Sequence, residues 1–243
     1  MPDQDRSAIP RKRYLFTTLA RQWKNTSSSD SLSVVIRENA KYGMTKHSDR
    51  YPESLARDGT RHVAGTILTD KELSNSAYTH VIRAPIQHVD IAAWLFKLPE
   101  AEYCRCCPPD HISCGTTSTD DGTPMSINVE MIGRTLMIQH YVAEVATPTL
   151  CRMVSTSDAF TPNGHTRVQV ICTLSAKPID ERTCEYTNSV VAHPTVEFME
   201  FIAKHNMTFG DAAAARQRDG GDHNRRETPL FAASIERQAL SRG

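Results

Sequence analysis

The sequence has no excess of either charge, because 28 lysine and arginine residues balance 28 aspartate and glutamate residues in a chain of 243. Nucleic-acid binding usually depends on a concentrated basic surface, so we expect no nucleic-acid partner. The sequence also lacks any run of about 18 apolar residues, the least that a membrane-spanning helix requires. These two absences favour a soluble protein without a membrane span.

Motifs of common enzyme classes are absent too. There is no glycine-rich phosphate loop, no Gly-x-Ser-x-Gly turn and no His-Glu-x-x-His zinc motif, so nucleotide-dependent chemistry and serine hydrolysis lack support. The seven cysteines are an odd number and no apolar signal-peptide core precedes them, which favours reduced thiols in the cytoplasm. Basic residues predominate over about the first 25 positions, and import into mitochondria is therefore the alternative.

The chain divides into two parts that differ in composition. Residues 1–75 are polar, include the serine-rich stretch 26–31 and have too little periodic apolar content to form a core. We predict that they form an N-terminal extension with short helices or partial disorder. Residues 76–243 carry the strand and helix patterns, and we predict that they form the main domain.

β-branched segments separated by short turns dominate this main domain. A first strand is predicted over 78–84, and a short helix over 89–96 follows it. Turns such as Asn163-Gly164 leave no room for the dozen or so residues of a parallel crossover, so consecutive strands must be antiparallel. The further predicted strands span 102–106, 112–119, 125–132, 135–145, 150–160, 166–175 and 183–192.

An amphipathic helix is predicted after the last strand, where Pro194 ends the β pattern. Phe198, Ile202 and Phe209 lie on its apolar side, and charged residues lie on the other. At about 17 residues the helix would span roughly 25 Å. That is long enough to lie across the dry face of the sheet.

The order of these elements resembles that of a known fold. A strand, a short helix, about six antiparallel strands and a long C-terminal helix make up the helix-grip fold. From residue 78 to about 209 the chain resembles the START and birch-pollen-allergen superfamily (SRPBCC), in particular its polyketide cyclases, dehydratases and lipid-transfer proteins. The resemblance implies an α+β domain whose curved antiparallel sheet wraps around the helix and leaves an apolar cavity. It implies no fixed set of catalytic residues.

The chain continues past the usual end of this fold. Gly220-Gly221 interrupts the helical pattern, and Thr228-Pro229 predicts the start of one more helix. This final helix is expected to cover the cavity or to form a homodimer contact. The charged stretch 223–227 is interpreted as a solvated helix start, with contact to a bound ligand as the alternative.

Alternation along the strands predicts which side chains face the cavity. Apolar residues at every second position of the strand 166–175 point to one side and would contact a hydrophobic ligand. Arg152 is expected either on the wet face or in the cavity, where it would bind a ligand carboxylate. The predicted ligand-binding residues are Val168, Val170, Cys172, Phe198, Ile202, Phe209 and Arg152.

Three polar residues are predicted to carry chemistry in this cavity. His140 faces inward if Ile138 does, and Tyr186 and Asn188 face inward if Cys184 does. An imidazole would then act as a base beside an enolisable carbonyl, while the phenol or the amide holds the oxyanion. The alternative is that each is a satisfied core group, or that a register shifted by one residue puts all three in water.

A group of cysteines invites a metal interpretation. Cys104, Cys106, Cys107 and Cys114 lie close to His111 in the sequence. Structural zinc sites usually separate their first pair of ligands by two to four residues, and this spacing does not match. Buried thiols explain the group at least as well, so we predict neither a metal nor another cofactor.

The sequence therefore predicts a cofactor-independent cyclase, dehydratase or isomerase that binds a hydrophobic small molecule and transfers protons. One alternative is a non-catalytic carrier or sensor of a lipid-like ligand. Another is a partner-binding protein whose cavity is filled by side chains, which a cavity volume below a few hundred Å³ would favour.

Overall fold

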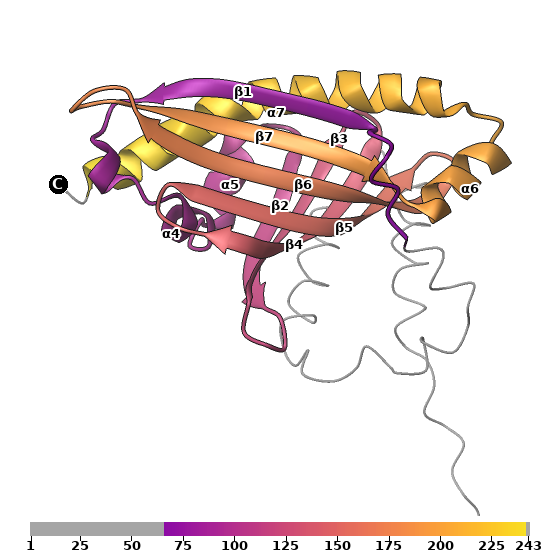
Figure 1. Ribbon diagram of the computed structural model, residues 1–243, viewed down its shortest axis with the longest axis horizontal. Coiled ribbons are helices and arrows are strands. Elements are labelled where there is room, and N and C mark those ends of the chain that lie inside the picture. Colours follow the sequence, from indigo (N-terminus) through magenta and orange to yellow (C-terminus); the bar gives the residue numbers. More distant parts are fainter. Residues whose placement is uncertain (1–65, 242–243) are drawn as a thin grey trace, which may run out of the picture. The chain divides into compact units, whose positions relative to one another are not determined.

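Seven antiparallel strands form the sheet of residues 66–241, the part of the chain that the computed structural model describes. Their order is β1-β7-β6-β5-β4-β3-β2, so β1 pairs with β7 and the later strands form a meander (Figure 1). The strands span Ser74–Ile82 (β1), His111–Ser118 (β2), Pro124–Ile132 (β3), Thr135–Ala146 (β4), Leu150–Thr161 (β5), Gly164–Pro178 (β6) and Cys184–Pro194 (β7).

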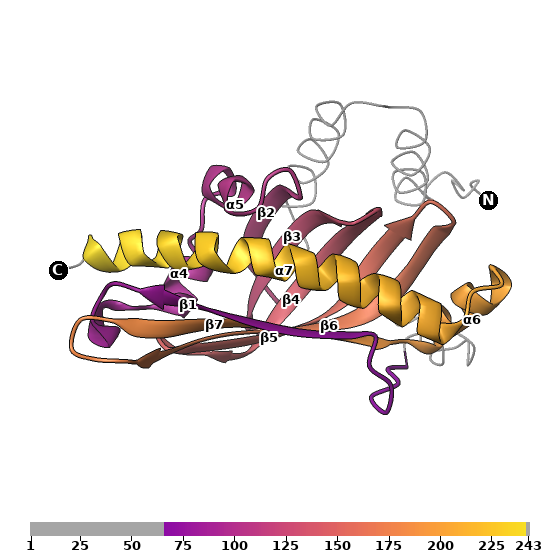
Figure 2. The ribbon, with the colours of Figure 1, turned by 90° about the horizontal axis from the view of Figure 1, so that it is seen from above.

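The helices lie between β1 and β2 and after β7. The first group is η2 (Ile86–His88), α4 (Ile91–Leu95) and α5 (Glu100–Cys106), and the second is α6 (Val196–Lys204) and α7 (Phe209–Leu240). Figure 2 shows α7, yellow to orange, extending along the sheet on the side that also carries α5. Among residues 66–241, no helix has the length and apolar content needed to cross a bilayer.

α7 is a single helix of 32 residues, so the predicted break at Gly220-Gly221 and the predicted new start at Thr228-Pro229 are wrong. Pro229 lies inside the helix. The Thr228 hydroxyl does not cap a new helix, because it donates a hydrogen bond to the Asn224 carbonyl one turn earlier, at 2.7 Å. Packing against the sheet outweighs the local cost of glycine and proline, as is usual for amphipathic helices in proteins. Buried side chains occur along the whole helix, at Ala212, His223, Phe231, Ile235 and Ala239.

The predicted helix after Pro194 is shorter than expected. α6 has nine residues; Thr195 caps it by accepting a hydrogen bond from the Phe198 N–H. Ile202 is buried, and Phe198 and Phe209 pack against the core. The apolar side of this segment therefore faces the protein as predicted, but α7 is the long helix that the sheet grips.

One predicted strand is a helix. Residues 102–106 lie in α5, which has Pro99 at its N-cap position and Glu100 and Glu102 in its first turn. Proline at a helix start and acidic residues in the first turn both favour a helix. The buried residues are Tyr103 and Cys106, three apart as on a helix face.

The packed domain begins before the predicted boundary at residue 76. Leu73 is buried, and Ile67 forms an isolated bridge with Thr195. Residues 1–65 of the predicted extension lie outside the described residues. The homodimer contact through the C-terminal helix stays a prediction. Leu230 and Leu240 on α7 are exposed.

Candidate functional site

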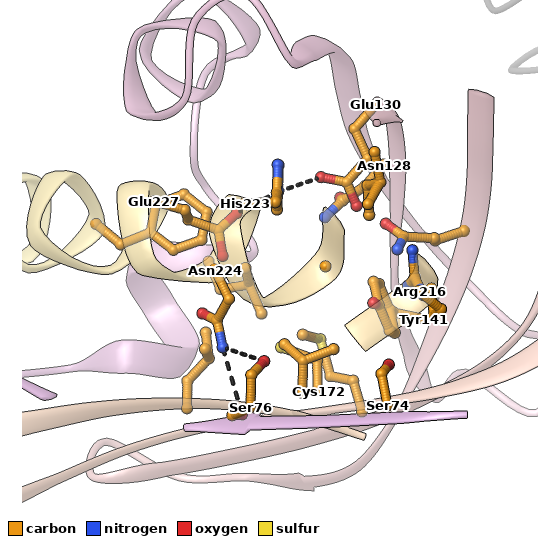
Figure 3. Close-up of a pocket in the computed structure, with 18 residues that line it drawn as sticks. Ser74, Ser76, Asn128, Glu130, Tyr141, Cys172, Arg216, His223, Asn224 and Glu227 are labelled. Carbon is orange, nitrogen blue, oxygen red and sulfur yellow. Dashed lines mark hydrogen bonds and ion pairs between the residues drawn. The ribbon is translucent and has the colours of Figure 1, made fainter. Parts of the chain in front are cut away.

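A cavity of about 40 Å³ lies between α7 and the inner face of the sheet (Figure 3). A buried water needs about 10–15 Å³ on this measure, so the cavity has room for about three water molecules. Its apolar lining includes Met153, Leu174 and Phe231. The charged and amide-bearing residues that line it are Asn128, Glu130, Gln139, Arg216, His223, Asn224 and Glu227.

Four buried residues, which we call the His–Glu cluster, converge at one side of this cavity: His111, Glu130, His223 and Glu227. His111 begins β2, Glu130 lies on β3, and the other two are four residues apart on one face of α7. The Nε2 atom of His111 lies 2.9 Å from Oε2 of Glu227 and 3.5 Å from Oε2 of Glu130. The Nε2 atom of His223 lies 3.0 Å and 3.3 Å from Oε2 of Glu130 and Glu227.

The other nitrogen of each imidazole is held by an acceptor. The Nδ1 atom of His111 lies 2.8 Å from the Tyr103 carbonyl oxygen, and the Tyr103 ring stacks on the imidazole. The Nδ1 atom of His223 lies 2.9 Å from Oδ2 of Asp110, which also pairs with Arg226. These contacts fix both rings so that their Nε2 atoms point to the centre of the cluster.

The carboxylates of the cluster are held as well. Glu227 accepts a hydrogen bond of 2.6 Å from Nδ2 of Asn188, and Glu130 accepts one of 3.3 Å from the Tyr103 hydroxyl. Burial alone would raise the pKa of Glu227, but hydrogen bonds from both histidines offset this and hold its pKa below the usual range. For Glu130 the charge of His223 likewise outweighs burial and lowers the pKa.

His223 shows the opposite shift. Burial favours its neutral form, but the negative charge of Glu130 and the hydrogen bond to Asp110 raise its pKa above the usual range. In the absence of another cation, His223 is therefore an imidazolium between carboxylates. A buried ion network of this kind costs desolvation energy that hydrophobic packing would avoid.

Two polar atoms of the cavity lining have no partner among residues 66–241. They are Nε of Arg216, which α7 carries, and Oε1 of Gln139 on β4. Buried polar atoms are normally paired, so an unpaired one calls for a water, an ion or a ligand. A guanidinium and an amide oxygen in the lining of one cavity suit a ligand that both accepts and donates hydrogen bonds.

Two of the three residues predicted to carry chemistry lie on the inner face as expected. Tyr186 and Asn188 are fully buried, which supports the predicted register of β7. Asn188 contacts the cluster through Glu227. Tyr186 is not among the residues that line the cavity, and its hydroxyl has no hydrogen-bond partner in the described part of the chain.

The predicted inward position of His140 is wrong. His140 is exposed on the outer face of β4, whereas its neighbours Gln139 and Tyr141 are buried and line the cavity. The prediction assigned the apolar alternate positions, and His140 with them, to the inner face of this strand. Gln139 and Tyr141 occupy that face instead, so the predicted register is wrong by one residue.

Among the predicted ligand-binding residues, Cys172 lines the cavity. Val168 and Val170 are buried on the inner face, and the three apolar residues at 198, 202 and 209 belong to the core around α6 and the start of α7. Arg152 points to the outer face, where it pairs with Glu144. The arginine that reaches the cavity is Arg216.

The sequence interpretation missed most of the polar lining. The stretch 223–227 was expected in solvent, yet His223, Asn224 and Glu227 are buried. One signal was present: a histidine and a glutamate four residues apart, with Phe231 four residues further on, share one helix face. The solvated helix start is therefore wrong, and the alternative that this stretch contacts a ligand stays a prediction.

No family model matches the chain, and no curated protein matches it. Similar solved structures include the Zhui aromatase/cyclase from Streptomyces sp. R1128, at 10% identity over 69% of this chain and 94% of that chain, with a TM-score of 0.49. Norcoclaurine synthase from Thalictrum flavum has 13% identity over 74% and 91%, with a TM-score of 0.40. A START superfamily protein from Mycobacterium smegmatis has 13% identity over 62% and 98%, with a TM-score of 0.37.

The element order and the sheet topology agree with the predicted fold. Residues 66–241 have a helix-grip fold, in which an antiparallel sheet packs around a long C-terminal helix. At such low identities and TM-scores the likeness says nothing of function, so the chemistry of the helix-grip domain has to be argued from its own cavity.

Proposed function

We propose that the helix-grip domain is an enzyme that binds a small molecule with a carbonyl or carboxylate group under α7 and moves protons on it. The observation that carries the proposal is the unpaired Nε of Arg216 in a cavity that the carboxylates of Glu130 and Glu227 also line. A cation that binds an oxygen and a base that accepts a proton are the two parts that enolisation needs.

The expected roles follow from the chemistry of each group. Arg216 would bind the carbonyl or carboxylate oxygen. Burial raises the pKa of the Tyr141 hydroxyl, which keeps its proton and can donate it in a hydrogen bond to the same oxygen. A carboxylate of the His–Glu cluster would take the proton from the carbon next to the carbonyl, and the electron pair of that bond would move to the oxygen.

The size and polarity of the cavity change the expected substrate. Ligand pockets for drug-sized molecules usually measure about 300–1,000 Å³, whereas this cavity measures about 40 Å³. A sterol or a polyketide would not fit without movement of α7. A small polar molecule is therefore favoured over the hydrophobic ligand that the sequence predicts.

The small volume also favours a second candidate, a protein whose cavity is filled by side chains and which binds no small molecule. The same cavity without chemistry would make a carrier. Hydrogen–deuterium exchange separates the three. The protein is incubated in D₂O with pyruvate, acetoacetate or oxaloacetate, and NMR follows the proton signals beside the carbonyl together with line broadening on binding.

We expect faster exchange with at least one of these acids, and its loss in Arg216→Gln and in Tyr141→Phe. His140→Ala, which changes only the outer face, is the matched control and should exchange as the wild type does. Binding without exchange would favour the carrier. If the folded protein neither binds nor exchanges any of the three acids, the proposal fails and the filled cavity is favoured.

A further inference from the structure

The His–Glu cluster directs two imidazole nitrogens and two carboxylate oxygens to one buried place, where either protons or a metal ion can satisfy them. The Tyr103 carbonyl oxygen can only accept a hydrogen bond, so Nδ1 of His111, 2.8 Å away, must carry the hydrogen. In neutral His111 the Nε2 atom then has no hydrogen. Its lone pair faces Oε2 of Glu227 at 2.9 Å, which places one acceptor against another.

His223 repeats the arrangement. Its Nδ1 atom lies 2.9 Å from the carboxylate of Asp110, so that nitrogen also carries the hydrogen. In the imidazolium its Nε2 atom also carries a hydrogen, which it donates to Oε2 of Glu130 at 3.0 Å. A metal ion that displaced this proton would find the Nε2 lone pair in the same position. Two imidazole nitrogens and two carboxylate oxygens thus point to one buried place, where a divalent ion could displace the protons and bind all four atoms.

We propose that His111, Glu130, His223 and Glu227 bind a divalent first-row transition metal such as zinc, iron(II) or manganese(II). Imidazole and carboxylate ligands together suit these ions. Ligand atoms about 2.1 Å from one ion lie roughly 3.0 Å apart in an octahedral arrangement and roughly 3.4 Å apart in a tetrahedral one. The four distances between nitrogen and oxygen atoms across the cluster, 2.9–3.5 Å, span both values.

The contacts around the cluster match those of metal sites. Histidines that bind metals usually donate their other N–H to a carbonyl or a carboxylate, which fixes the ring and its tautomer. Here the Tyr103 carbonyl and the Asp110 carboxylate hold these positions. Asn188 donates to the other oxygen of Glu227, which leaves Oε2 to face the centre.

A thiolate is a competing ligand. Cys107 lies near His111 and His223, and the three could also hold an ion. The sulfur of Cys107, however, lies 3.7 Å from Nδ1 of His223, the nitrogen that already bonds to Asp110. His223 cannot present Nδ1 to a metal while that bond persists, so the two glutamates are the better ligands.

Three of the four proposed ligands also line the cavity, whereas His111 is not among the lining residues. Figure 3 shows Glu130, His223 and Glu227 on the cavity side, with the ion pair between Glu130 and His223 drawn. An ion there would face the cavity and would engage the carboxylates that otherwise serve as the base, so it would polarise a bound carbonyl in place of that role. This last step rests on the proposed function, but metal binding itself does not.

Metal binding is tested on the full chain, stripped with a chelator and titrated with Zn²⁺ or Mn²⁺ in a calorimeter. We expect one ion per chain for at least one of the two metals. Cobalt(II) as a spectroscopic probe should give visible d–d bands without a thiolate-to-cobalt charge-transfer band in the near ultraviolet.

Four variants make the test specific. Glu227→Gln and His111→Gln should weaken binding at least tenfold, whereas Cys107→Ser and His140→Ala should bind as the wild type does. If the first two do not fold by circular dichroism, Asp110→Asn serves instead, because loss of such an outer contact typically costs about 10–100-fold in affinity.

The proposal is overturned if the folded wild type binds no ion at stoichiometric level, since the cluster is then a metal-free ion network. Equal affinity in His111→Gln would also overturn it. So would a charge-transfer band that disappears in Cys107→Ser, because the ion would then be held by the thiolate. Failure of the exchange experiment above would leave metal binding unaffected, which keeps the two proposals separate.

Discussion

The two halves of α7 pack against the same sheet with opposite chemistry. The half from Arg216 to Glu227 places charged and amide side chains in the cavity and the His–Glu cluster. The half from Phe231 to Ala239 packs mainly through apolar contacts, among them the edge-to-face packing of Phe231 on Trp94, with ring centroids 5.0 Å apart, and Phe231 also borders the cavity. A helix that only had to close the core would carry the second pattern throughout.

The difference indicates what each half contributes. Apolar burial stabilises the fold, whereas buried charges cost desolvation energy and are often replaceable by apolar residues without loss of stability. Substitutions in the apolar half should therefore lower stability, and substitutions in the polar half should change binding and chemistry.

The largest effect is expected in the apolar half. Phe231→Ala removes a buried aromatic ring beside Trp94 and enlarges the cavity that the ring borders. We expect the free energy of unfolding to fall by about 3–5 kcal/mol. Urea denaturation measures it, with the exposed Leu240→Ala as the control, which should change stability by less than about 0.5 kcal/mol. Equal effects of the two substitutions would contradict the comparison.

Binding of a metal ion to the polar half of α7 should raise the stability of the folded protein. An ion at about a hundred times its Kd would stabilise the folded state by about 2.7 kcal/mol. For a domain of this size the melting temperature should then rise by roughly 5–10 °C. Thermal denaturation with and without Zn²⁺ or Mn²⁺ measures this rise, which should be lost in Glu227→Gln. A rise of the same size in that variant would point to ions bound elsewhere.

Arg216→Met should separate stability from function. The substitution replaces a guanidinium whose Nε is buried and unpaired with an apolar chain of similar length. We expect stability to stay the same or to rise by about 1 kcal/mol, while proton exchange on the small keto acids is lost. Denaturation and exchange are measured on the same preparation. A loss of several kcal/mol would show that Arg216 supports the fold.

The smallest effect is expected at His140, on the outer face of β4. His140→Ala should leave exchange and metal affinity unchanged and should alter stability by less than about 0.5 kcal/mol. Parallel exchange and denaturation experiments measure this. Loss of exchange in the variant would restore the sequence prediction and contradict the observed register.

How much the sequence could predict differs between the sheet and the site. Alternation in β6 and β7 predicted the buried faces of Val168, Val170, Tyr186 and Asn188, because each of these strands carries apolar residues on one side. The β4 register could not be predicted in this way. Its inner face carries Gln139, and a polar residue in a strand is predicted to face solvent when the sequence alone is considered.

The site depended on contacts that no local pattern contains. His111, Glu130 and the pair on α7 come from segments far apart in the sequence, and only the folded sheet brings them together. The continuity of α7 through Gly220-Gly221 and Pro229 was also hidden, because tertiary packing overrides local propensity there. Histidine and glutamate at a spacing of four was the one local clue.

Native mass spectrometry of the wild-type chain as purified tests the proposed metal binding by the polar half of α7 most directly. The account predicts a folded species heavier than the bare chain by the mass of one divalent ion, and predicts that Glu227→Gln lacks it. A folded wild type with the mass of the bare chain, unchanged after incubation with Zn²⁺ or Mn²⁺, would contradict it.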